Sequence, residues 1–146
     1  MSQQDVDLVR LLNLPPGVDW AATARDDELN GAIQQQVRSY FDPEFECALV
    51  GVTEMWRSGL DGLRRVWLDW LEPWASYRTE EEETRDLGDG RVLYLGRDFG
   101  GRRDGLGEVE LLSSAIWTIR DGKVTQIVFY ASRDAALEAA ASAASD

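Results

Sequence analysis

The chain has 146 residues, 44% of them hydrophobic, which is enough to bury a core and excludes a disordered protein. Its 27 acidic residues outnumber the 15 basic ones, and the net charge of −12 argues against partners with phosphate backbones or anionic membrane surfaces. The sequence has no histidine, and Cys47 is the only cysteine. Intrachain disulfides, histidine metal sites and histidine-dependent nucleophiles are therefore excluded.

No apolar run approaches the roughly 20 residues that span a bilayer. Residues 1–5 lack the basic and apolar regions of a signal peptide, and a lone cysteine gives no argument for export. We therefore expect a soluble, cytoplasmic protein with neither nucleic acid nor membrane as a partner. No metal or cofactor motif stands out, so no cofactor and no metal is expected.

Three helices are predicted in the first half of the chain, at Asp5–Leu14, Asp27–Tyr40 and Asp61–Trp74. Each has apolar residues at helical spacing. The third has the widest apolar stripe, formed by Leu63, Val66, Trp67, Trp70, Leu71 and Trp74. Between the second and third helices, Phe45–Leu49 alternates like a half-buried strand, and Gly51–Gly59 is predicted to be a loop.

The second half of the chain predicts four strands, at Tyr77–Leu87, Arg91–Phe99, Glu108–Arg120 and Val124–Ala131. The acidic run Glu80–Glu83 is typical of a sheet edge that is protected by charge. Asp134 begins an alanine-rich terminal helix, and residues 140–146 are expected to fray. Helices followed by consecutive strands indicate an α+β domain.

Five runs of sequence suggest a family by their order and spacing. They are DPEFE at 42–46, RSGLDGLRRVW at 57–67, GDGRV at 88–92, AIWTIRDGKV at 115–124 and SRDAALEA at 132–139. In this order they resemble the SnoaL-like polyketide-cyclase family of the nuclear transport factor 2-like (NTF2-like) superfamily. The resemblance covers about residues 40–140, whereas residues 1–25 differ from the family's usual opening helix.

The resemblance implies a single domain over residues 1–146 with the cone-shaped fold shared with ketosteroid isomerases. In this fold a curved antiparallel sheet wraps around a long helix, with further helices at the N-terminus and a short one at the C-terminus. The superfamily often forms homodimers through the outer sheet face, and Trp56 or Tyr130 could serve there. Ligands bind between the long helix and the concave face of the sheet.

Strand alternation combined with this resemblance gives a candidate pocket. Its members are Phe45, Cys47, Trp67, Trp70, Trp74, Leu93, Leu95, Arg97, Ser113, Ala115, Trp117, Ile127 and Phe129. A slip of one residue would move any strand's side chains to the other face. Two readings stay open for most of them, since the tryptophans can be core and Cys47 can be an inert thiol rather than a nucleophile.

The isomerase branch of the superfamily uses a carboxylate base, an oxyanion-stabilising Asp and a Tyr. By spacing these positions fall near Cys47, Ala115 and Trp67, none of which is an acid or base of that kind. Proton abstraction beside a carbonyl needs both a base and an oxyanion donor. Ketosteroid isomerase activity is therefore not expected.

The function expected is the binding of a small, largely apolar or amphipathic molecule, with cyclase, isomerase or hydrolase activity left open. Arg97 could hold a carboxylate or enolate of this molecule, or could instead form a salt bridge at the rim. The alternatives are a non-catalytic carrier or sensor that uses the same pocket, and a dimeric protein-interaction module.

Overall fold

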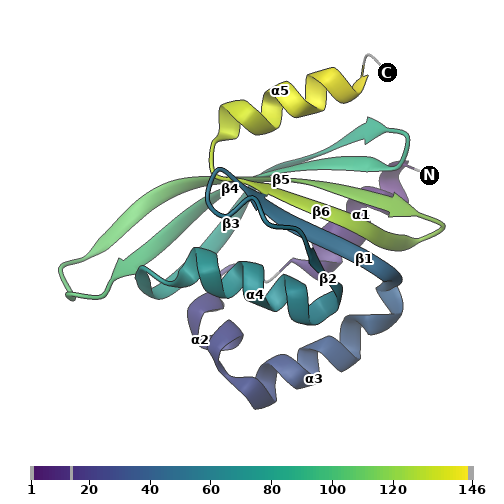
Figure 1. Cartoon of the computed structure of the whole chain (residues 1–146). Coiled ribbons are helices and arrows are strands. Elements are labelled where there is room, and N and C mark those ends of the chain that lie inside the picture. Colours follow the sequence, from purple (N-terminus) through teal and green to yellow (C-terminus); the bar gives the residue numbers. More distant parts are fainter. Residues whose placement is uncertain (1, 14, 145–146) are drawn as a thin grey trace.

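The chain forms one six-stranded mixed sheet with helices on both of its sides (Figure 1). The computed structural model describes residues 2–13 and 15–144, so Leu14, where the first helix was predicted to end, lies outside the described residues. Within them there are five α-helices and one short 3-10 helix. None of these helices is both long and apolar enough to cross a membrane.

The first half of the chain supplies most of the helices. Its elements are α1 (Ser2–Leu12), α2 (Trp20–Arg25), α3 (Asp27–Val37), the 3-10 helix Arg38–Tyr40, β1 (Phe41–Val50), β2 (Arg57–Ser58) and α4 (Gly59–Leu71). The short helix α2 was not predicted. Asp19 caps it, because its carboxylate accepts hydrogen bonds from the backbone N–H groups of Ala21 and Ala22.

Helix α4 ends at Leu71, so the prediction that it continues to Trp74 is wrong. Pro73 has no backbone N–H and restricts the residue before it, which ends the helix. Trp74 instead begins the next strand and its ring packs on Gly100, where an added Cβ would lie 2.5 Å from the indole. This tryptophan therefore holds two strands together at the end of the helix.

The second half of the chain builds most of the sheet. Its elements are β3 (Trp74–Gly88), β4 (Arg91–Arg102), β5 (Glu108–Arg120), β6 (Lys123–Tyr130) and α5 (Arg133–Ala144). The strand order is β2-β1-β6-β5-β4-β3, and β1 runs parallel to β6 whereas the other neighbours are antiparallel. The acidic strand β3 is therefore an edge strand, as its charges predicted.

Helices cover both faces of this sheet (Figure 1). Side chains of β1, β4, β5 and β6 pack with α1 and α4 in one core cluster, which includes Phe45, Val66, Tyr94 and Trp117. On the opposite face α5 packs against β4 and β5 in a second cluster, which includes Leu93, Ile116 and Ala136. The predicted α+β cone, with a curved sheet around the long helix, is confirmed.

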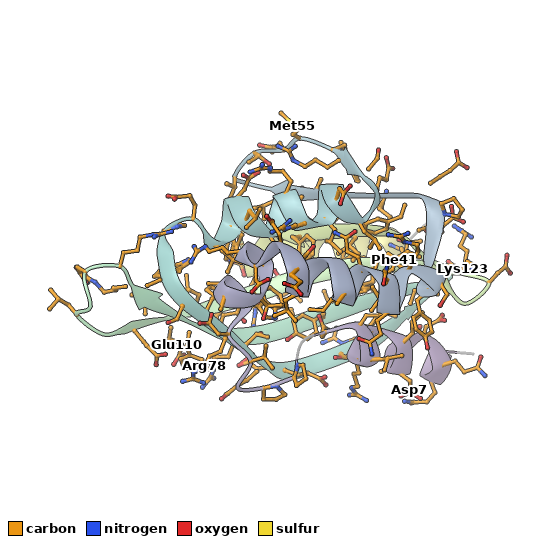
Figure 2. All side chains as sticks on the ribbon, turned by 90° about the horizontal axis from the view of Figure 1, so that it is seen from below. Asp7, Phe41, Met55, Arg78, Glu110 and Lys123 are labelled. Carbon is orange, nitrogen blue, oxygen red and sulfur yellow. The ribbon has the colours of Figure 1, made fainter. Side chains whose placement is uncertain are left out.

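Figure 2 shows the concave side of the sheet, where α4 and the N-terminal helices lie over the strands. Arg78 and Glu110 lie toward one end of it, and Phe41 and Lys123 lie toward the other. Arg78 and Glu110 lie in line across the sheet, because Phe99 of β4 pairs with Arg78 of β3 on one side and with Glu110 of β5 on the other. Asp98 precedes Phe99 in this strand and lies close to that end.

Candidate functional site

A cavity of about 50 Å³ lies among α2, α4 and the inner face of the sheet. Four tryptophans line it, and most of its wall is apolar. The lining residues are Asn13, Trp20, Leu49, Val66, Trp67, Trp70, Tyr94, Asp98, Ser113, Ser114, Ala115, Trp117, Phe129 and Tyr130. An apolar hollow with a few convergent polar groups is the usual form of a small-molecule site.

Six of the residues proposed from the sequence lie around this cavity. They are Trp67, Trp70, Ser113, Ala115, Trp117 and Phe129. The two tryptophans come from α4 and the others from β5 and β6. They are candidates for contact with a ligand.

The side chains chosen from β4 face away from the cavity, so this part of the expected pocket is wrong. Leu93 and Leu95 pack under α5 on the outer face. Arg97 is also on that side: its side chain is 47% exposed and forms ion pairs with Glu82 and Glu110. Of the two alternatives for Arg97, the structure has the salt bridge and not the anchor inside the pocket.

Phe45, Cys47 and Ile127 are buried in the core cluster beside the cavity and do not line it. Burial raises the pKa of the Cys47 thiol to about 12, which keeps it protonated and unreactive. Trp74, which lies on β3 rather than on the helix, is also absent from the lining. These residues therefore belong to the packed clusters around the cavity rather than to its lining.

The residue that the sequence analysis missed is Asp98, the neighbour of Arg97. It is only 2% exposed and its carboxyl group lines the cavity. Thr79 Oγ1 and Ser113 Oγ donate to its Oδ1 at 2.5 and 2.8 Å, and Tyr77 Oη donates to its Oδ2 at 2.5 Å. A carboxylate has about four acceptor positions, so roughly one remains for another donor.

Two further groups fix the direction of these hydrogen bonds. Trp70 Nε1 donates to Tyr77 Oη at 2.7 Å, so the tyrosine proton is directed at Asp98. Tyr94 Oη lies 3.2 Å from Thr79 Oγ1, and since Thr79 donates to Asp98, Tyr94 is the donor in this pair. Donors from strands β3 and β5 thus converge on a single carboxyl group, and Trp70 of α4 and Tyr94 of β4 donate in turn to two of these donors.

The environment of Asp98 changes its acidity. Burial raises the pKa of the Asp98 carboxyl above its ordinary 3.8, and the hydrogen bonds from Thr79, Tyr77 and Ser113 partly oppose this shift. Burial likewise raises the pKa of Tyr94 to about 12 and raises the pKa of Tyr77 above its ordinary value. Both tyrosines therefore remain neutral hydrogen-bond donors at physiological pH.

Three other lining residues have donors with no acceptor among the described residues. These are the side-chain amide of Asn13 and the indole N–H groups of Trp20 and Trp67, all of which are buried. In the same part of the chain, residues 2–13 and 15–144, no group of three or more acidic or cysteine side chains could hold a metal ion. The polar character of the site is thus one carboxyl group together with neutral donors.

The comparisons with known proteins agree on the fold only. No family model matches the sequence, and no curated protein matches it significantly. Among solved structures, TerC co-crystallised with polyporic acid is similar at a TM-score of 0.62 and 19% identity, over 94% of this chain and 98% of that chain. A protein from Jannaschia sp. CCS1 described as a SnoaL-like polyketide cyclase has a TM-score of 0.62 and 18% identity, over 97% of this chain and 93% of its own.

A third solved structure extends the comparison to the isomerase branch. This protein from Catenulispora acidiphila DSM 44928 has a ketosteroid isomerase-like fold and was solved in complex with trimethylamine. It has a TM-score of 0.55 and 12% identity, over 84% of this chain and 88% of its own. At such identities the likeness establishes architecture rather than activity. The chain therefore has the NTF2-like fold that SnoaL-like and ketosteroid isomerase-like proteins share.

Proposed function

We propose that this protein binds a small, largely apolar molecule in the cavity and that Asp98 accepts a hydrogen bond from a hydroxyl group of that molecule. The observation that carries the proposal is a buried carboxyl group in an apolar wall, with about one acceptor position left. Burying a carboxyl group costs free energy, so stability alone is a poor reason to have one there. Neighbours solved with polyporic acid and with trimethylamine add support, since their fold holds small molecules.

The size of the cavity limits how a ligand can enter. At about 50 Å³ it is smaller than the roughly 150 Å³ apolar cavity known to take up benzene, so a ring requires the wall to move. Asn13 and Tyr94 belong both to this wall and to an outer cleft lined by Leu11, Pro15 and Pro16. We propose that the ligand enters from this cleft by displacing Asn13.

Binding of 4-ethylphenol tests the proposal against ethylbenzene, which has the same shape without the hydroxyl group. The protein is expected to bind 4-ethylphenol roughly tenfold more tightly, because a phenol donates a hydrogen bond to the Asp98 carboxyl. Asp98→Asn is expected to reduce this preference to about threefold or less. Heteronuclear NMR titrations give the dissociation constants.

Glu110→Gln is the matched control, since it removes an exposed carboxylate on β5 and should leave the preference unchanged. The spectra also show whether each variant keeps the native fold. An equal affinity of the parent protein for both compounds would contradict the role of Asp98. Failure of both to bind would overturn the proposed function itself.

A second candidate function is proton transfer on the bound molecule. The observation that favours it is a carboxyl group with a raised pKa in the wall of a mostly apolar cavity, hydrogen-bonded in a network with two neutral tyrosines. A positioned carboxyl group of this kind serves as general acid or base in many enzymes, whereas a carrier or sensor does not need one.

Exchange of the methyl protons of acetophenone in deuterated buffer distinguishes an enzyme from a carrier. If Asp98 is a base, the protein is expected to accelerate this exchange at least tenfold over buffer, and Asp98→Asn should abolish the effect. Proton NMR follows the loss of the methyl signal. An exchange rate equal to that in buffer would contradict proton transfer by Asp98 and would favour a carrier over an enzyme.

The remaining alternative is a homodimeric interaction module. It is favoured by the exposed loop 51–56, in which Trp56 is 50% exposed beside Val52 and Met55. Helix α5 already covers the apolar part of the outer sheet face that was the expected interface. A dimer in sedimentation experiments at micromolar concentration would support this alternative, and a monomer would count against it.

A further inference from the structure

Three hydrogen-bond donors in the cavity wall have no acceptor in the part of the chain that the structure describes. The amide of Asn13 and the indole N–H groups of Trp20 and Trp67 are buried and unpaired among the described residues. In contrast, Trp70 lines the same cavity and its indole N–H is paired with Tyr77. Buried donors are almost always paired in folded proteins, so three exceptions around one cavity call for an explanation.

The positions of the two indole donors are fixed by well-defined contacts. The rings of Trp20 and Trp67 are stacked, with centroids 5.3 Å apart, which brings α2 against α4. Asp19 holds the start of α2, because it accepts from its first turn and also from the backbone N–H of Tyr77 in β3. Arg25 holds its other end by donating to the carbonyl oxygens of Leu71 and Trp74. The two unpaired indole donors are therefore held in place by α2 and α4, whereas Asn13 lies in the connection before α2.

The charge of the cavity indicates which acceptor these donors suit. The residues that line it within the described chain include no arginine or lysine, and the one ionisable acid among them is Asp98. An anionic ligand would leave water without meeting a cation and would lie near a carboxyl group. Neutral donors without a cation suit a neutral acceptor such as a carbonyl oxygen.

We propose that Asn13, Trp20 and Trp67 form a subsite for a neutral hydrogen-bond acceptor, the carbonyl oxygen of a ring-bearing ketone. This inference rests on the proposed function, since it concerns the same cavity. Together with Asp98, the subsite selects an uncharged hydroxyketone, whose hydroxyl group donates to the carboxyl and whose carbonyl accepts from the indoles. A carboxylate ligand, which was one of the two partners considered for Arg97, is selected against.

Four probes of nearly equal shape separate the two polar contacts. Ethylbenzene carries no polar group, 4-ethylphenol carries the hydroxyl, acetophenone carries the carbonyl, and 4-hydroxyacetophenone carries both. The protein is expected to bind acetophenone about five- to tenfold more tightly than ethylbenzene, and 4-hydroxyacetophenone most tightly. Benzoate, the charged counterpart of acetophenone, should bind more weakly than acetophenone.

Substitutions then assign the contact to its residues. Trp20→Phe keeps an aromatic ring without the N–H donor and should reduce the preference for acetophenone to about twofold, while the preference for 4-ethylphenol over ethylbenzene is retained. Asn13→Leu, in the connection before α2, provides a second variant that leaves the stacked rings untouched. Phe129→Leu is the control, because it changes an apolar wall and should alter the affinities for all four probes by a similar factor.

The NMR signals of the indole N–H groups test the subsite in the parent protein, without any substitution. The indole N–H signals of Trp20 and Trp67 should shift downfield with acetophenone and not with ethylbenzene. If all four probes bind with acetophenone no tighter than ethylbenzene, or if benzoate binds more tightly than acetophenone, the subsite is refuted and the proposed function stands. If none of the four binds, ethylbenzene included, the proposed function fails first.

Discussion

Replacing Asp98 by alanine is expected to lower the free energy of unfolding by about 2–4 kcal/mol at pH 4. The hydroxyl groups of Tyr77, Thr79 and Ser113 all donate to this carboxyl and would lose their acceptor in a buried place. A buried donor without a partner costs about 1–3 kcal/mol, and some relief comes from rearrangement. Urea unfolding followed by tryptophan fluorescence measures the loss.

The pH dependence of this loss follows from the raised pKa of Asp98. Because burial raises this pKa above 3.8, the native state holds the proton more tightly than the unfolded chain does. The stabilising contribution of the carboxyl is complete below about pH 3.8 and decreases as the pH rises toward the raised value. The difference between the parent and Asp98→Ala should therefore shrink with rising pH, by at most about 1.4 kcal/mol per pH unit.

Glu110→Gln is again a suitable control, since it removes an exposed carboxylate and should show no comparable dependence. A difference between the parent and Asp98→Ala that grows as the pH rises would contradict a raised pKa. It would mean that the three hydrogen bonds outweigh burial.

Much of the fold could be predicted because its elements carry clear local signals. The strand Glu108–Arg120 was predicted with the observed bounds, because its ends are marked by a glycine-rich loop and by the Asp121-Gly122 turn. Helix α2 could not be found by periodicity, since its six residues make fewer than two turns. The signal for it was Asp19 at the N-cap position directly before Trp20.

Which side chains of β4 point to the inner face of the sheet could not be predicted from the sequence of this strand. From Val92 to Leu95 every residue is apolar and buried, because side chains of α1 and α4 pack on one face of the strand and α5 packs on the other. The sequence of β4 therefore shows no alternation of apolar and polar residues. The choice of Leu93, Leu95 and Arg97 as inward-facing residues was wrong by one position. The face of β5 was chosen correctly, and its pairing of Ala115 with Tyr94 gives the face of β4.

The partners of Asp98 on β3 were hidden for a different reason. Thr79 pairs directly with Asp98, but the register of β3 against β4 shifts between Glu81 and Glu83 and again between Asp86 and Gly88. Counting back from the turn therefore gives wrong partners for Tyr77 and Thr79. The strand was recognised, yet the network that it supplies required the three-dimensional structure.

The absence of acids at Cys47, Ala115 and Trp67 excludes a carboxyl group only at those positions. The cavity has its carboxyl group on β4, and the tyrosines of the network around this group come from β3 and β4 rather than from α4. The prediction that the protein lacks ketosteroid isomerase activity stays a prediction. Any proton transfer in this cavity would depend on the network around Asp98.

Tyr77→Phe is expected to lower the free energy of unfolding by about 2–3 kcal/mol and to raise the pKa of Asp98 further. The Tyr77 hydroxyl is buried, accepts from Trp70 Nε1 and donates to Asp98 Oδ2, so its removal leaves both partners short of a hydrogen bond. The lost bond is one that lowers the pKa of the carboxyl. Carbon-13 NMR of the Asp98 carboxyl against pH measures the second effect.

Tyr94→Phe is the matched control, because it removes the same hydroxyl group from another tyrosine of the network. Tyr94 Oη lies 3.2 Å from Thr79 Oγ1, and its part in the network reaches Asp98 only through Thr79. We therefore expect a loss of about 1 kcal/mol or less in this variant and little change in the pKa of Asp98. Equal losses in the two variants, together with an unchanged pKa of Asp98 in Tyr77→Phe, would contradict a direct contribution of Tyr77 to the carboxyl.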